Sequence, residues 1–132
     1  MSRQPRMPML NTAKIIAFVP IRDSQRSRPF YEGVLGLRFL SDDPFAMLMD
    51  SNGVRVRLAK VPMFTPAEFT VMGWDVADIQ RTVTELQKKG VGFERFPGMQ
   101  QDKLGIWSAP SGAKVAWFKD PDGNILSLSQ HP

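Results

Sequence analysis

The fold is decided by the stretch IRDSQRSRPFYEGVLGLRF, residues 21–39, because its arrangement of a helix-capping aspartate and a helix-ending glycine is repeated later in the chain. Asp23 can cap a helix that Gly36 ends, and Asp78 and Gly90 do the same in the second half. The aspartates are 78 − 23 = 55 residues apart and the glycines 90 − 36 = 54 residues apart. This agreement predicts an internal repeat.

Each helical segment lies among short segments rich in β-branched and aromatic residues, which predict strands. The expected strands are residues 14–21, 38–41, 45–50 and 54–60, then 69–76, 91–96, 105–108, 113–119 and 124–129. We expect a flexible tail at residues 1–13 and a single domain at 14–132. Its parts are repeat one at 14–60, a linker at 61–68 and repeat two at 69–130. The pattern predicts an α+β fold of two βαβββ units. Pro29 should either make the first turn of the first helix irregular or move the start of the regular helix nearer Arg28.

Composition excludes several classes of site. The 132 residues include no cysteine, and the single histidine, His131, is the penultimate residue. Disulfides, thiolate nucleophiles and cysteine-based metal sites are therefore excluded. No apolar run could span a membrane and no signal-peptide core is visible, so we expect a cytoplasmic protein without a membrane partner. The net charge of +4 is dispersed along the chain, and we expect no nucleic-acid partner.

Three motifs in order point to a known family. They are residues 21–23 with FYEGVLGL at 30–37, VADI at 76–79, and FKDPDGN at 118–124. Together they make the chain resemble the glyoxalase/bleomycin-resistance/dioxygenase (vicinal oxygen chelate) superfamily over about residues 14–130. The resemblance implies an open, curled mixed sheet that forms a cleft, with helices on its outer face, and a homodimer.

The resemblance also implies four metal-ligand positions, at which enzymes of the superfamily hold one divalent metal. Counting from the capping aspartates and the hairpin glycines transfers these positions to this chain, where they hold Ile16, Arg57, Val71 and Ser127. Divalent metals need imidazole, carboxylate or several carbonyl oxygens. We therefore expect no metal and no cofactor.

Strand alternation identifies the side chains that share a face with these positions. The candidate ligand-binding residues are Arg57, Arg55, Ile16, Phe18, Val71, Ser127 and Asp75, and the same rule adds Gly73, Ile125 and Ser129 to the cleft lining. A guanidinium in a partly dry cleft favours a carboxylate or phosphate. Alternatively, Arg55 or Arg57 pairs with Asp75 or reaches solvent at the rim. Both interpretations stay open.

A metal-independent small-molecule binding protein for anionic or neutral organic ligands fits this pattern best. A metal-dependent lyase, isomerase or dioxygenase is disfavoured by the ligand positions, and a metal-free enzyme would have Asp75 as its only placed acid. An interaction or nucleic-acid-binding module is a further alternative, supported only by net charge. Trp74 is expected to face the helix layer as part of the core. The facing of Trp107 and Trp117 is open, with core packing favoured over ligand stacking.

Overall fold

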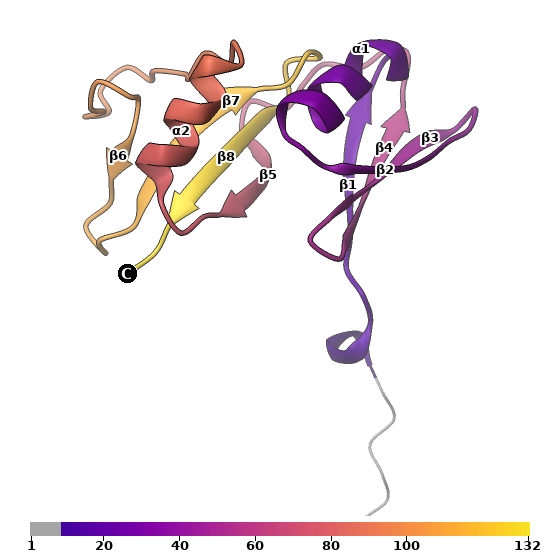
Figure 1. Cartoon of the computed structure of the whole chain (residues 1–132), viewed down its shortest axis with the longest axis horizontal. Coiled ribbons are helices and arrows are strands. Elements are labelled where there is room, and N and C mark those ends of the chain that lie inside the picture. The colour runs from indigo at the N-terminus through magenta and orange to yellow at the C-terminus, as the bar shows by residue number, and fades with distance from the viewer. Residues whose placement is uncertain (1–8) are drawn as a thin grey trace, which may run out of the picture.

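Two four-stranded mixed sheets make up the fold, and the computed structural model describes residues 9–132. The first sheet has the order β1-β4-β3-β2 and the second the order β5-β8-β7-β6 (Figure 1). The strands are β1 (Ile16–Ile21), β2 (Arg38–Asp42), β3 (Ala46–Ser51), β4 (Val54–Lys60), β5 (Thr70–Asp75), β6 (Trp107–Ser108), β7 (Lys114–Lys119) and β8 (Ile125–Gln130). In each sheet the first and last strands in chain order pair in parallel, β1 with β4 and β5 with β8. The other pairs are antiparallel. The equivalent strand orders confirm the α+β fold of two repeats.

One helical segment follows the first strand of each repeat. In the first repeat α1 (Ser24–Arg28) continues into a π-helical turn, η2 (Pro29–Val34), and in the second α2 runs over Ile79–Lys88. Both capping aspartates are confirmed. The Asp23 carboxylate accepts a hydrogen bond from the backbone N–H of Gln25, and the Asp78 carboxylate accepts one from the backbone N–H of Arg81. The expected effect of Pro29 is wrong in its position: the regular α-helix comes first and ends at Arg28, and the π-helical turn begins at Pro29, because proline has no N–H to continue the α-helical pattern. None of the helices in residues 9–132 is long and apolar enough to cross a membrane.

One expected strand is absent from the structure. Residues 91–96 do not form a strand: Phe93 makes a single bridge to Phe118, and the chain then leaves the sheet as a loop that spans residues 95–106. The side chain of Gln101 provides the reason, because it occupies the hydrogen-bonding groups that a strand would use. Of the expected tail, residues 1–8 lie outside the described residues, and 9–13 are exposed and include a short 3-10 turn, η1 (Leu10–Thr12).

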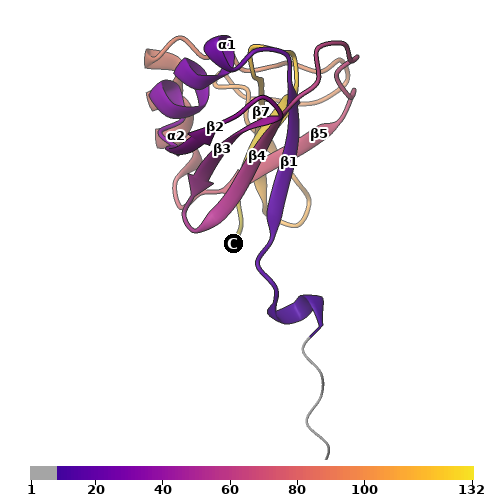
Figure 2. The same ribbon diagram turned by 90° about the vertical axis from the view of Figure 1, so that its right-hand side faces the viewer.

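A single hydrophobic core lies against one face of each sheet. Alternate residues of β1 and β4, such as Val19, Ile21 and Leu58, are fully buried, and so are Phe118 and Leu126 of the second sheet. Ile79, Val83 and Leu86 of α2 complete the same cluster. Within residues 9–132 no second cluster covers the other face of the first sheet, and Figure 2 shows its four strands side by side at the front of the molecule. Each sheet therefore has a core face and an outer face.

A buried carboxylate ties the last hairpin of the second repeat to the first repeat. Asp120 accepts a 2.7 Å hydrogen bond from the Tyr31 hydroxyl, and its other oxygen accepts from the backbone N–H groups of Asp122 and Asn124. The Asn124 amide in turn donates to the backbone carbonyl of Pro20 at 2.7 Å. Burial raises the pKa of Tyr31 far above its usual value, and the Asp120 charge adds to the effect. The tyrosine is thus held as a neutral donor.

Two further contacts complete this network. Arg22 forms an ion pair with Asp122 at 3.1 Å and donates to the Phe64 carbonyl in the linker at 2.9 Å. Its guanidinium also lies over the Phe64 ring, 4.4 Å from the centroid. The RD and DPDGN motifs therefore act together, as the joint between the two repeats.

We expect Tyr31→Phe to destabilise the protein by about 1–3 kcal/mol, since a buried carboxylate loses a donor. Urea unfolding at neutral pH measures the effect. Glu32→Gln, which removes only the exposed ion pair with Arg28, is the control and should change stability by about 0.5 kcal/mol or less. Equal stability of the two variants would contradict the role given to the Tyr31–Asp120 bond.

Candidate functional site

The outer face of the first sheet holds four of the candidate residues, and we call it the arginine face. Parallel pairing places Ile16 beside Arg55 and Phe18 beside Arg57. Phe18 is 62% exposed and Ile16 45%, which is unusual for apolar side chains of a sheet. Strand alternation therefore placed these four residues together correctly.

Antiparallel pairing with β3 and β2 extends the same face. Asp50 lies beside Arg55, and Arg38 lies beside Asp50. A pocket of about 500 Å³ forms over this row. It is lined by Lys14, Ile15, Ile16, Arg38, Leu40, Asp50, Gly53 and Arg55. Three cations against one carboxylate make the pocket suited to an anion.

Sequence reasoning missed Arg38 and Lys14. The Ser51-Asn52-Gly53 turn could have placed Asp50 opposite Arg55, and the β2–β3 pairing would then have added Arg38. No comparable signal marks Lys14, which precedes the first strand.

The arginines of this face are not neutralised by close partners. Within residues 9–132, none of Arg38, Arg55 and Arg57 forms an ion pair, with Asp75 or with any other acid. Arg57 is half-buried and lies near Asp43. The pKa of Asp43 is lowered mainly by the backbone N–H groups of Phe45 and Ala46, and the Arg57 charge contributes. Within the described part of the chain, neither Arg55 nor Arg57 pairs with Asp75, whereas Arg55 is exposed, as the alternative in which it reaches solvent predicts.

The outer face of the second sheet has a different chemistry, and we call it the tryptophan face. Strand pairing places Gly73, Ser127 and Trp117 in one row. The next row holds Asp75, Ser129, Val115 and Trp107. The two tryptophan rings have centroids 6.3 Å apart, and Phe96 meets Trp117 edge to face at 5.4 Å. Core packing was the wrong expectation for Trp107 and Trp117, because both are half-buried on the face opposite the core.

Val71 departs from the expected alternation. The β5–β8 register shifts between Thr70 and Met72, so Val71 is the extra residue of a bulge. Its side chain packs against the core cluster instead of lying with Gly73 and Asp75. A bulge of this kind has no signal in the apolar pattern.

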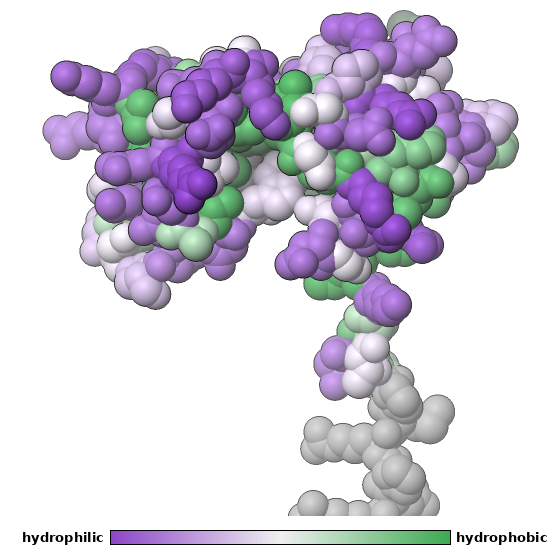
Figure 3. All heavy atoms as spheres, viewed as in Figure 1, coloured by the Kyte–Doolittle hydropathy of each residue, from purple (hydrophilic) through white to green (hydrophobic). Residues whose placement is uncertain are grey.

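The two outer faces do not share a pocket within residues 9–132, because the repeats meet through their core faces. Trp74 faces the core, as expected, and stacks on Phe118 with centroids 6.4 Å apart. Its indole N–H donates to the Ser51 hydroxyl of the first repeat at 3.0 Å. A hollow of about 310 Å³ lies at this junction (Figure 3).

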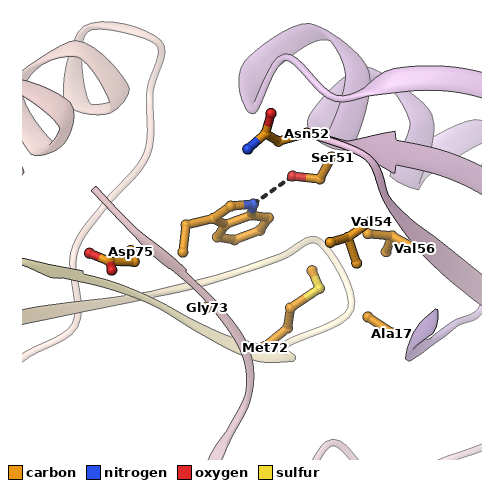
Figure 4. Close-up of a pocket in the computed structure, with 9 residues that line it drawn as sticks. Ala17, Ser51, Asn52, Val54, Val56, Met72, Gly73 and Asp75 are labelled. Carbon is orange, nitrogen blue, oxygen red and sulfur yellow. Dashed lines mark hydrogen bonds between the residues drawn. The ribbon is translucent and has the colours of Figure 1, made fainter. Parts of the chain in front are cut away.

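Figure 4 shows how the two repeats face this hollow. Met72 points towards Val54 and Val56 of the first repeat, whereas Asp75 points away from that repeat. Asp75 and Ser127 are thus separated from Arg55 and Arg57 in a single chain.

The residues at the four family ligand positions do not fit a divalent metal. Ile16 and Val71 have no donor atom, Arg57 is a permanent cation, and Ser127 offers one hydroxyl. In the part of the chain that is described, no group of three or more His, Asp or Glu side chains is arranged to hold a metal ion. No metal-dependent step can be built on these residues.

Comparisons with known proteins agree with the fold. Residues 13–128 match the family model described as the Glyoxalase/Bleomycin resistance protein/Dioxygenase superfamily. The uncharacterised protein YraH of Bacillus subtilis (strain 168) is 26% identical over 125 residues, which cover 82% of this chain and 90% of that protein.

Two solved structures are similar in fold at low sequence identity. A bleomycin resistance determinant encoded on the transposon Tn5 aligns with a TM-score of 0.72 at 20% identity, over 91% of this chain and 98% of that one. TnmS3, an antibiotic binding protein from Streptomyces sp. CB03234, aligns with a TM-score of 0.67 at 21% identity, over 95% and 100%. At these identities the likeness concerns the fold alone.

We expect Gly73→Ala to destabilise the protein by about 1–3 kcal/mol, because the added methyl would overlap the Ser127 hydroxyl and lie 3.0 Å from its backbone oxygen. Thermal unfolding of Gly73→Ala with and without Ser127→Ala measures the effect, and the second change should recover part of the loss. Gly92→Ala is the control, since its methyl meets no atom within 4 Å. A neutral Gly73→Ala would show that β5 and β8 can separate at this row.

Proposed function

Because the chain belongs to the glyoxalase/bleomycin resistance protein/dioxygenase superfamily, we propose that it is a small-molecule binding protein that works without a bound metal. The mismatch of all four ligand positions supports metal independence. Two proteins of similar fold are named for resistance to an antibiotic or for binding one, which supports a binding role. The preferred ligand is an anionic or neutral organic compound.

The charge of the arginine face is the observation that favours an anion. Arg38, Arg55 and Arg57 form no ion pairs within the described residues, so a ligand carboxylate or phosphate would meet cations that need not first release a partner. Arg57 stands where the resemblance places a metal-binding carboxylate, which reverses the local charge. A cationic drug such as bleomycin is correspondingly disfavoured.

We also propose that the working form is a homodimer. Phe18 and Ile16 expose apolar surface at the centre of the arginine face, and a second copy could cover it. In a two-fold dimer, the arginine face of each copy can oppose the tryptophan face of the other, which creates two equivalent clefts. The candidate residues that one chain separates, Arg57 and Ser127, would then line one cleft.

Binding is favoured over catalysis because of the position of Asp75. It is exposed on β5, beside Ser129. Among residues 9–132 it forms no ion pair and no side-chain hydrogen bond that would orient it as an acid or base.

In thermal-shift measurements on chelator-treated protein, we expect small carboxylates or phosphates to raise the melting temperature, with or without Zn²⁺, Ni²⁺ or Fe²⁺. A free ligand concentration a hundredfold above Kd stabilises the folded protein by about 2.7 kcal/mol. Arg57→Ala should abolish the shift, whereas Arg81→Ala on the exposed side of α2 should retain it. A shift with metal alone would overturn the proposal of metal independence.

For the homodimer, we expect light scattering after gel filtration to give twice the 14.9 kDa chain mass at micromolar concentration. Phe18→Glu should shift the protein towards monomer, because it places a charge in the apolar part of the interface. Met63→Glu is the control, since Met63 is 90% exposed on the linker, away from this face. A wild-type monomer at all concentrations would contradict the proposal.

A further inference from the structure

The geometry of the second sheet points to a ligand class: we propose that the ligand is a planar aromatic compound with an acidic group. Its ring would stack on the tryptophan face, and its acid would meet the arginine face of the second copy. This inference rests on the proposed function, because the arginines and the dimer come from it. The tryptophan face adds the requirement for an aromatic ring.

The tryptophan pair stands between two hollows. One of about 270 Å³ is lined by Trp117, Phe96, Phe69, Ile125 and Met99, among others. The other, of about 490 Å³, adjoins Trp107 and is also lined by Met99. Aromatic rings bind other rings by offset stacking or by edge-to-face contact. Both hollows therefore present the surfaces that a flat ligand ring needs.

The loop over residues 95–106 builds part of this surface and is firmly held. The Gln101 amide donates to the carbonyls of Glu94 and Gly105 at 2.9 and 2.8 Å, and its oxygen accepts from the Phe96 backbone. One Asp102 oxygen accepts from the backbone N–H groups of Leu104 and Ile106, both at 2.9 Å. These bonds fix the loop that brings Phe96 and Met99 beside the tryptophans.

The charges around the tryptophan face indicate where the acidic group of the ligand would bind. The residues that line the two hollows include one acid, Glu68, and no lysine or arginine. By strand alternation Lys119 also lies on this face, but it forms an ion pair with Glu94 at 3.4 Å, so an acidic group needs cations that are not already paired. In the proposed dimer Arg55 and Arg57 are suited candidates, because they would line the opposing face and form no ion pair within residues 9–132. The two surfaces together select a ring at one end and an acid at the other.

Calorimetric titrations with three probes separate these contributions. The probes are 2-naphthoate, cyclohexanecarboxylate, which keeps the acid without an aromatic ring, and 2-naphthylmethanol, which keeps the ring without charge. We expect 2-naphthoate to bind at least tenfold more tightly than either of the others. Trp117→Leu should lower the affinity for 2-naphthoate by about tenfold and leave the affinity for cyclohexanecarboxylate unchanged. Trp117→Phe should retain most of the affinity for 2-naphthoate.

The outcomes distinguish this inference from the proposed function. The aromatic requirement is overturned, while the anion site stands, if both acids bind with equal affinity and Trp117→Leu changes neither affinity. An unchanged melting temperature shows that this variant is folded. If only the two naphthalene compounds bind, equally and without dependence on Arg57, the acid requirement is overturned. If neither acid binds although small phosphates or carboxylates raise the melting temperature, the inference is overturned and the proposed function stands. If none of these anions and none of the three probes binds, both are overturned.

Mixing two inactive variants tests whether the ring and the acid are bound by different copies. Arg57→Ala and Trp117→Leu chains that exchange subunits should regain about a quarter of the high-affinity sites, since one cleft of each mixed dimer receives both intact faces. Lack of recovery, with exchange verified by mass spectrometry, would overturn the composite site. Recovery beyond what separate variants show would support it.

Discussion

The buried carboxylate of Asp120 is the interaction on which the arrangement of the two sheets depends. It belongs to the last hairpin of the second repeat, yet it accepts its shortest hydrogen bond from Tyr31 of the first. Arg22 and Asp122 form a second connection between the same segments. Because the repeats are joined on the core side, their core faces meet and both outer faces remain free. The separation of the arginine face from the tryptophan face follows directly from this joint.

Much of this organisation could be predicted from the sequence, because it depends on local chemistry. The capping residues Asp23 and Asp78 and the alternation in β1 and β4 correctly predicted the helices and the exposure of Phe18. The bulge at Val71 could not be predicted, since a bulge changes register without changing composition. Residues 91–96 read as a strand because the competing partner, Gln101, lies outside that segment. Side-chain bonds of this kind, which reach across a loop of a few residues, leave no mark in the apolar pattern.

The candidate site shows the same division. Repeat spacing assigns Arg57 and Ser127 to equivalent positions of the two repeats, and their chemistry is poorly suited to a divalent metal. The facing of Trp107 and Trp117 required the register of β6, β7 and β8. Only with that register does the second sheet become an aromatic surface opposite in character to the charged first sheet. The two repeats thus carry different chemistry at matching positions.

The way the loop at residues 95–106 is anchored also bears on how such a protein can change. Gln101 and Asp102 secure the loop from within, and β7 and β8 form their ladder without it. The segment at residues 97–100 lies next to Trp107 but contributes nothing to the core. Substitutions in this segment should therefore cost little folding stability, whereas substitutions of Asp120 or Tyr31 should cost more. In the proposed site, the part that selects the ligand is thus separable from the part that holds the fold together.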